Sequence, residues 1–215
     1  MTDQKIIAVA LVLSALLIAG GLYYSKQAPT TPAAILPSAT PDSPTITENG
    51  LIIGNPDAPV VIEEYTNFLC PACASFATGA LEQIKNDYVK TGKAKLVLFI
   101  YPPQELAKAA LCANEQGKFT EYHDYLFSHQ KDPGITKEQD IKDFAVNAGL
   151  DGAAFDACYA SDKYTEKAQK WYDEGMARGV EATPTFFFNG KKFIGAQPYA
   201  EFKKIIEDEL AKVKQ

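Results

Sequence analysis

Two cysteines between an expected strand and an expected helix constrain the fold more than any other feature of the sequence. Cys70 and Cys73 form a C-x-x-C pair. The apolar run before them, at residues 60–66, is typical of a buried strand, and residues 77–88 after them are apolar at helical spacing. A second apolar run at residues 95–101 predicts another strand. This order, with short connections, predicts a βαβ unit with two parallel neighbouring strands.

The position of the pair favours redox chemistry. Cys70 is expected at the N-cap of the helix, followed by Pro71 in its first turn, where proline is favoured. The helix dipole and the unpaired N–H groups there stabilise a thiolate, whereas Cys73 falls on the inward face. Thiol–disulfide exchange requires one exposed and one screened sulfur. The alternatives are two structural cysteines or half of a zinc site completed by Cys112 and Cys158 or by histidines. We favour the redox pair and expect no metal and no cofactor.

After the βαβ unit, the sequence predicts a helical block followed by a hairpin and a last helix. Residues 103–179 are expected to form a helical block. Beyond it, residues 185–194 predict a hairpin around an Asn-Gly turn, and residues 199–210 are apolar at helical spacing. The order is therefore βαβ, helical block, ββα, within a folded domain at residues 50–215.

The N-terminal segment is expected to send this domain out of the cytoplasm. Residues 6–24 carry no charge, and as a helix they would span roughly 28 Å, close to a bilayer core. We favour an uncleaved membrane anchor at residues 1–26, and a cleaved signal peptide is the alternative. The first predicts a single-pass protein of the cell membrane with its folded domain outside, and the second a secreted or periplasmic protein.

Composition separates a spacer from the folded domain and excludes several classes of protein. Residues 27–49 are rich in Pro, Thr, Ser and Ala and are expected to form an extended spacer. The chain has a net charge of −6 and no stretch that combines Lys and Arg with aromatic residues, so we expect no nucleic-acid binding. Four cysteines are too few for a disulfide-dense small scaffold.

Five motifs occur in the order found in one known family. They lie at residues 54–59, 70–73, 112–119, 179–185 and 195–199. The sequence resembles the DsbA-like thiol:disulfide oxidoreductases, and within them a membrane-anchored branch related to Gram-positive and archaeal enzymes. The resemblance covers about residues 50–213. It implies an α/β thioredoxin fold with a mixed central sheet and an inserted helical subdomain at about residues 103–179.

The resemblance also implies roles for four residues. Cys70 resembles the family's nucleophilic cysteine, and Cys73 resembles its buried partner. Thr183-Pro184 resembles the loop whose cis-proline faces the disulfide and whose backbone pairs with an extended substrate at Thr183. An ordinary trans proline at the start of a strand is the alternative.

A fifth residue matches a buried acid present in many members of the family. Glu64 precedes Cys70 by six positions and would relay protons to Cys73. Glu63 competes for the inward position, because alternation along a strand turns only one of the two inward. We favour Glu64 as the inward residue; otherwise it is a surface residue of the strand.

The active-site dipeptide, Pro71-Ala72, departs from the strongest oxidants of the family, which carry His at the second position. Ala72 cannot donate a hydrogen bond to the Cys70 thiolate or add positive charge. The thiolate is therefore expected to be less stabilised and the disulfide less oxidising. Both directions of catalysis stay open.

The other two cysteines lie in the helical block, and neither has a cysteine near it in sequence. In an oxidising compartment Cys112 and Cys158 are expected to pair, as similar cysteines do in some relatives. Closing this loop would stabilise the fold by roughly 4 kcal/mol. Two buried free thiols are the alternative. His123 and His129 are interpreted as surface or packing residues.

The expected function is that of an extracytoplasmic thiol oxidase that donates disulfides to unfolded or extended secreted polypeptides. Its reduced form would be reoxidised by a membrane quinone-coupled partner of the DsbB-like or VKOR-like type. A reductase or isomerase using the same site is the first alternative. A non-enzymatic peptide-binding module is the second, and the intact C-x-x-C argues against it.

Overall fold

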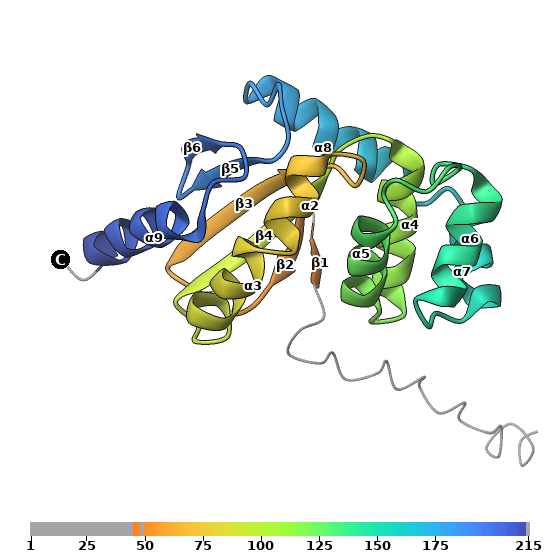
Figure 1. Cartoon of the computed structure of the whole chain (residues 1–215), viewed down its shortest axis with the longest axis horizontal. Coiled ribbons are helices and arrows are strands. Elements are labelled where there is room, and N and C mark those ends of the chain that lie inside the picture. Colours follow the sequence, from red (N-terminus) through yellow and green to blue (C-terminus); the bar gives the residue numbers. More distant parts are fainter. Residues whose placement is uncertain (1–44, 48–49, 214–215) are drawn as a thin grey trace, which may run out of the picture. The chain divides into compact units, whose positions relative to one another are not determined.

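The two apolar runs of the βαβ unit lie side by side in one sheet in the computed structural model, which describes residues 45–47 and 50–213 (Figure 1). The described strands form a six-stranded sheet in the order β1-β2-β4-β3-β5-β6. In this sheet β3 and β4 are parallel, and the other neighbours are antiparallel. The strands are β1 (Thr45–Thr47), β2 (Gly50–Ile53), β3 (Val60–Thr66), β4 (Ala94–Ile100), β5 (Thr185–Phe188) and β6 (Lys191–Ile194).

The first helical stretch is broken, whereas the sequence predicts one continuous element. Its pieces are α2 (Pro71–Ala77), α3 (Ala80–Ile84) and the π-helical turn η1 (Lys85–Val89). The break falls at Gly79, whose φ of −123° and ψ of −93° are not helical; glycine has little preference for the helical conformation. The helices after β4 are α4 (Gln104–Glu115), α5 (Phe119–Ser128), α6 (Glu138–Asn147), α7 (Gly152–Ala160) and α8 (Thr165–Ala177), and α9 (Tyr199–Val213) follows the hairpin.

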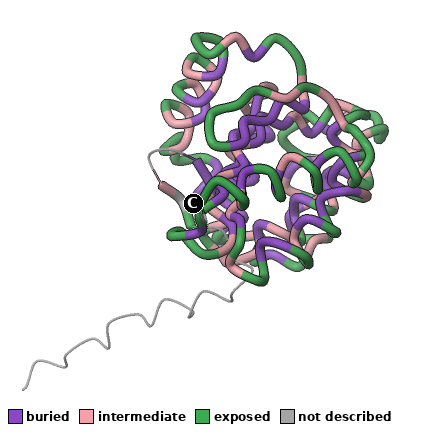
Figure 2. Tube along the Cα trace, turned by 90° about the vertical axis from the view of Figure 1, so that its left-hand side faces the viewer, coloured by how far each residue is buried: buried purple, intermediate pink, exposed green. Residues whose placement is uncertain are grey.

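Aromatic contacts show which face of the sheet each helix covers. On one face, Phe76 of α2 and Phe202 of α9 both pack on Phe186 of β5, with ring centroids 4.7 and 5.0 Å apart. On the other face, Trp171 of α8 packs against Phe99 of β4 at 5.9 Å. The buried residues, purple in Figure 2, concentrate in the interior of the folded domain. The sheet is therefore covered on both faces, with α2 and its cysteines on the face opposite α8.

The helical insertion is tied together by a disulfide. Cys112 of α4 and Cys158 of α7 form this bond, with Cα atoms 5.8 Å apart. Both residues are buried, and the neighbouring Tyr122 donates its hydroxyl to the carbonyl of Ile141, joining α5 to α6. The insertion thus has a cross-link of its own, separate from the C-x-x-C.

The predicted order of elements is confirmed, but the first two strands were not predicted. β1 falls inside the segment expected to be a spacer, and it pairs with β2 through the register Thr45–Ile52. The proposed anchor at residues 1–26 and most of the spacer lie outside the described residues. Within the part that the structure describes, no helix has the length and apolar character needed to cross a membrane.

Candidate active site

The C-x-x-C lies where β3 gives way to α2. Cys70 is the N-cap of α2, with φ −87° and ψ 118°, and Pro71 begins the helix. Both cysteines are free thiols; Cys70 is half-buried, and Cys73 is fully buried on the inward side of α2. One sulfur is thus accessible from outside and the other is screened, as the sequence predicts.

Hydrogen bonds around Cys70 favour its thiolate. Burial raises the pKa of this thiol, but hydrogen bonds from the Thr183 side chain, from Cys73 and from the backbone of Ala72 outweigh it, and the net pKa is lowered. In its protonated form the Cys70 sulfur donates to the carbonyl oxygen of Thr183 at 3.1 Å. The backbone contribution comes from the first turn of α2, where N–H groups have no intrahelical acceptor. Cys70 is therefore the sulfur that ionises first.

The environment of Cys73 has the opposite effect. Burial, with a smaller contribution from the nearby Glu64, raises its pKa to about 12, against lowering by a hydrogen bond from the Asn67 backbone and by the polar side chains of Thr66 and Thr183. Glu64 itself is buried, and this burial raises its pKa to about 8. A carboxyl group with a pKa near neutrality can both release and accept a proton at working pH. Glu64 is thus suited to exchange protons with Cys73.

The two neighbouring glutamates of β3 point to opposite faces of the sheet. Glu64 aligns with Phe186, which belongs to the face covered by α2. Glu63 pairs instead with Arg178, whose two guanidinium nitrogens donate to the two carboxylate oxygens at 2.8 Å each. The position of Glu64 on the inward side therefore agrees with the expectation, and Arg178 supplies the partner that holds Glu63 on the other face.

The Thr183-Pro184 loop lies against the accessible cysteine. The peptide bond between these residues is cis, and Pro184 accepts a hydrogen bond from the backbone of Gly195 at 2.8 Å. Thr183 is half-buried and leads directly into β5. The loop and Cys70 are thus in direct contact through the Cys70–Thr183 hydrogen bond.

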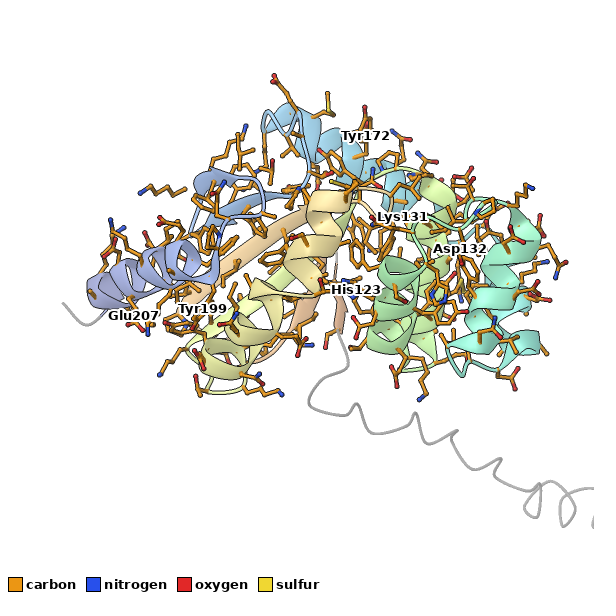
Figure 3. All side chains as sticks on the ribbon, viewed as in Figure 1. His123, Lys131, Asp132, Tyr172, Tyr199 and Glu207 are labelled. Carbon is orange, nitrogen blue, oxygen red and sulfur yellow. A yellow bond between two sulfur atoms is a disulfide. The ribbon has the colours of Figure 1, made fainter. Side chains whose placement is uncertain are left out.

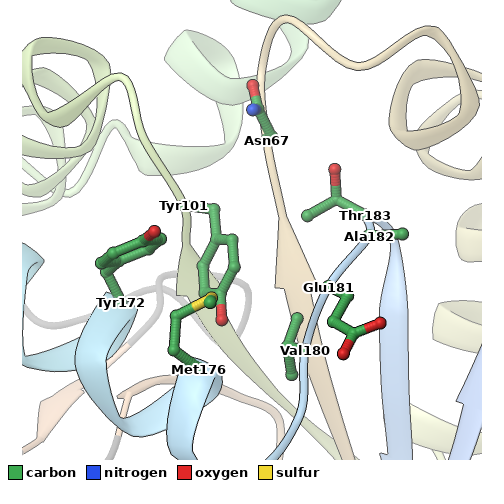
Figure 4. Close-up of a pocket in the computed structure, with 8 residues that line it drawn as sticks. All are labelled: Asn67, Tyr101, Tyr172, Met176, Val180, Glu181, Ala182 and Thr183. Atoms are coloured by element: carbon green, nitrogen blue, oxygen red, sulfur yellow. The ribbon is translucent and has the colours of Figure 1, made fainter.

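A pocket of about 380 Å³ opens beside this loop (Figure 4). It lies between α8 and the segment that leads to Pro184, and Thr183 belongs to both the pocket and the surroundings of Cys70. Tyr172 and Met176 come from α8, and Met176 is 46% exposed. The pocket is lined by Asn67, Tyr101, Tyr172, Met176, Val180, Glu181, Ala182 and Thr183. The pocket therefore offers a mixture of aromatic, apolar and polar side chains next to the Thr183-Pro184 loop.

One contact at the site was missed by sequence reasoning. Gln130, in the loop after α5, donates its side-chain amide to the carbonyls of Phe68 and Cys70 at 3.2 and 3.4 Å. The helical insertion therefore holds the backbone of the redox loop directly. No motif surrounds Gln130, so nothing in the sequence signals this contact.

The remaining candidates lie away from the redox pair or serve in packing. His123 is buried on the side of α5 near α2, where its ring packs against Phe68 and Phe127 (Figure 3). His129 stacks on Tyr125. Among the described residues, no group of three or more His, Cys, Asp or Glu side chains is placed to hold a metal ion.

Comparisons with known proteins agree with this geometry. The sequence profile of a family described as thioredoxin matches residues 46–208. "Disulfide bond formation protein D" of Bacillus subtilis (strain 168) is 26% identical over 178 residues, which is 74% of this chain and 76% of that protein. "Na(+)/H(+) antiporter NhaA 1" of Mycobacterium sp. (strain KMS) is 33% identical over 175 residues, 76% of this chain. The matched region is 27% of that protein, so the chain spans about a quarter of the length of such relatives.

Solved structures show the same fold. BdbD from Bacillus subtilis, in its oxidised form, superposes with a TM-score of 0.66 at 24% identity, covering 80% of this chain and 98% of that one. DsbA from Chlamydia trachomatis gives a TM-score of 0.65 at 24% identity, covering 77% of this chain and 93% of that one. The thioredoxin fold with a helical insertion is thereby established for the described part of the chain.

Proposed function

Since the chain belongs to the thioredoxin family, and within it to the DsbA-like thiol:disulfide oxidoreductases, we propose that it donates disulfides to polypeptides outside the cytoplasm through Cys70 and Cys73. The observation that carries this proposal is the contrast between the two thiols. Cys70 is accessible and its pKa is lowered, whereas Cys73 is buried with a pKa of about 12. Cys70 is suited to react with a substrate, and Cys73 is suited to form or release the internal disulfide with Cys70.

In the proposed reaction a substrate thiolate attacks the Cys70 sulfur of the oxidised enzyme. The Cys70–Cys73 bond breaks, a mixed disulfide forms, and Cys73 leaves as a thiolate. With its high pKa, Cys73 takes up a proton, which Glu64 supplies from its protonated carboxyl group. A second substrate thiolate then attacks the substrate sulfur of the mixed disulfide, and Cys70 leaves as a thiolate. The substrate loses two electrons and gains a disulfide, and the enzyme ends as a dithiol.

The proposed substrate is an extended polypeptide that pairs with the backbone beside Thr183 and Pro184. The hydrogen bond between Cys70 and the Thr183 carbonyl supports this, because it brings the reacting sulfur to the same edge. The adjoining pocket would receive a side chain next to the reacting cysteine. Unfolded chains meet this requirement, because their cysteines are accessible and their backbone is free to pair.

The proposed location is the outer face of the cell membrane, with residues 1–26 as anchor and residues 27–49 mostly as tether. The relatives whose names describe disulfide bond formation support an oxidative role, and disulfides form and persist mainly outside the cytoplasm. The reduced enzyme needs an oxidant for each cycle, and a membrane quinone-coupled reoxidase of the DsbB-like or VKOR-like type is the proposed partner.

Ala72 makes the site compatible with a second activity, disulfide reduction or isomerisation. Its side chain is exposed and apolar, so it adds neither charge nor a hydrogen bond to the Cys70 thiolate. A less stabilised thiolate gives a less oxidising disulfide, and such a couple also serves a reductase or isomerase.

One experiment tests the proposed direction. The oxidised full-length protein is mixed with a reduced, unfolded polypeptide containing two cysteines, and free thiols are counted over time. We expect the substrate to lose both thiols for each enzyme disulfide consumed. The proposal fails if no substrate thiol is lost. Equilibration with glutathione at a potential near that of thioredoxin, about −270 mV, would favour the reductase instead.

A further inference from the structure

Thr66, the last residue of β3, has a buried hydroxyl group without a hydrogen-bond partner. The residue is 1% exposed, and its Oγ1 atom is one of few buried side-chain polar atoms in the described part that lack a partner. Its backbone carbonyl, by contrast, accepts a hydrogen bond from Tyr101 at 2.7 Å. Burying a hydroxyl without a partner destabilises a fold, and such groups are rare in native proteins. Its presence here therefore requires an explanation.

The neighbours of Thr66 suggest one. Thr66 follows Glu64 by two positions on the same strand, so both side chains point to the face covered by α2, on which Cys73 lies. Burial raises the pKa of both Glu64 and Cys73, and in both cases the nearby polar side chain of Thr66 lowers it. The same hydroxyl is thus a polar neighbour of the carboxyl group and of the inner thiol.

Few other groups are placed to pass a proton between Glu64 and Cys73. The strand neighbours of Glu64 are Leu98 of β4 and Phe186 of β5, which are apolar. Apart from Glu64 and Thr66, the groups with the largest effects on the pKa of Cys73 are Asn67 through its backbone and Thr183 through its side chain. No Lys, Arg or His is among the largest causes of the pKa shifts of Glu64 and Cys73. Thr66 therefore carries the hydroxyl that acts on both Glu64 and Cys73.

We infer that the Thr66 hydroxyl relays the proton between Glu64 and Cys73. This inference rests on the proposed function. When a substrate thiolate breaks the Cys70–Cys73 bond, the Cys73 thiolate accepts the hydroxyl proton of Thr66 while Thr66 accepts the proton of the Glu64 carboxyl group. In the reverse direction, Cys73 attacks the mixed disulfide and its proton passes through Thr66 to the Glu64 carboxylate. Thr66 ends each transfer with its hydroxyl proton restored, so it acts as a proton relay.

The test compares Thr66→Val, which removes the hydroxyl at nearly constant volume, with Thr66→Ser, which keeps it. Thr66→Val should be at least as stable as the parent, because an unpartnered polar group is lost. It should nevertheless slow disulfide transfer by about tenfold, the effect of one lost hydrogen bond to a charged group. Thr66→Ser should restore most of the rate, and Thr66→Ala serves as a second hydroxyl-free variant if Thr66→Val folds poorly.

Two further readouts separate a relay from a packing role. In a double-mutant cycle, Thr66→Val should have little effect on the rate once Glu64→Gln is present, because both changes interrupt one path. The Glu64 carboxyl pKa, followed by ¹³C NMR in the reduced protein, should shift upward by about one unit in Thr66→Val. Equal rates for the parent and Thr66→Val, or additive effects in the cycle, would overturn the inference. If the parent protein transfers no disulfide but the NMR shift is found, the proposed function fails while the contact between Thr66 and Glu64 stands.

Discussion

Cys70 and Cys73 lie at the open N-terminus of α2, whereas Cys112 and Cys158 are both buried between α4 and α7. In the first pair, one thiol is half-buried with a lowered pKa and the other is buried with a raised one. In the second pair, no sulfur is accessible, and a bond already joins two helices of the insertion. Sulfur chemistry depends on access and thiolate character. Cys70 and Cys73 are therefore suited to thiol–disulfide exchange, whereas Cys112 and Cys158 form a structural cross-link.

The largest effect is expected from removing the outer sulfur. Cys70→Ser should lower disulfide transfer by more than about 10³-fold, because the only accessible sulfur of the site is lost. Cys73→Ala should instead accumulate mixed disulfides with substrate, visible as a mass increase that reductant reverses. Retained transfer in Cys70→Ser would show that the distinction between the two sulfurs is wrong.

The buried carboxyl group should make stability depend on pH. The pKa of Glu64 is raised by burial from 4.5 to about 8, so the folded state binds a proton that the unfolded state releases between these values. Stability from this group is full below about pH 4.5 and is lost as the pH rises through 8. Glu64→Gln should remove this loss, worth up to about 5 kcal/mol.

Urea unfolding of the reduced protein at several pH values measures this effect. The parent should become less stable than Glu64→Gln as the pH rises from 5 to 8, before Cys73 titrates. Parallel curves for the two proteins would show that Glu64 is ionised throughout and is no proton reservoir for Cys73.

Removing the second pair should affect stability and leave transfer nearly intact. The bond closes a sequence separation of 46 residues, so Cys112→Ala/Cys158→Ala is expected to lose about 4 kcal/mol or less. Thermal unfolding gives the stability change, and transfer is measured at a temperature where the variant is folded. A large loss of activity in the folded variant would place this pair in the redox relay and break the comparison.

The smallest effect is expected at the dipeptide. Ala72→His adds a donor and partial positive charge beside Cys70, so the Cys70 pKa should fall by roughly one unit and the disulfide should become more oxidising. Ultraviolet absorbance of the thiolate and equilibration with glutathione measure the two quantities. An unchanged titration would show that the helix terminus and Thr183 alone determine the thiolate energy.

Much of this arrangement could be predicted from the sequence, because it depends on local patterns. The strand, the C-x-x-C and the helix start are adjacent in the chain, and alternation on β3 limits the inward acid to Glu63 or Glu64. The same alternation places Thr66 on the face of Glu64, so the inward position of Thr66 could also have been predicted. It was missed because an unpartnered hydroxyl is visible only once its surroundings are known.

Contacts between distant segments could not be predicted in this way. Gln130 reaches the redox loop across 60 residues, and Arg178 reaches Glu63 across 115. Both depend on how the insertion and α8 pack against the sheet, which no periodicity encodes. The strand β1 was missed for a related reason: its three residues are too few for a pattern, and pairing with β2 defines it.

The difference between Cys70 and Cys73 is tested most directly by asking which one reacts first. The fully reduced protein is treated at pH 7 with less than one equivalent of iodoacetamide, quenched with acid, and mapped by peptide mass spectrometry. The lowered pKa and half-exposure of Cys70, against the burial of Cys73, predict that the adduct lies on Cys70. An adduct found mainly on Cys73 would contradict this assignment.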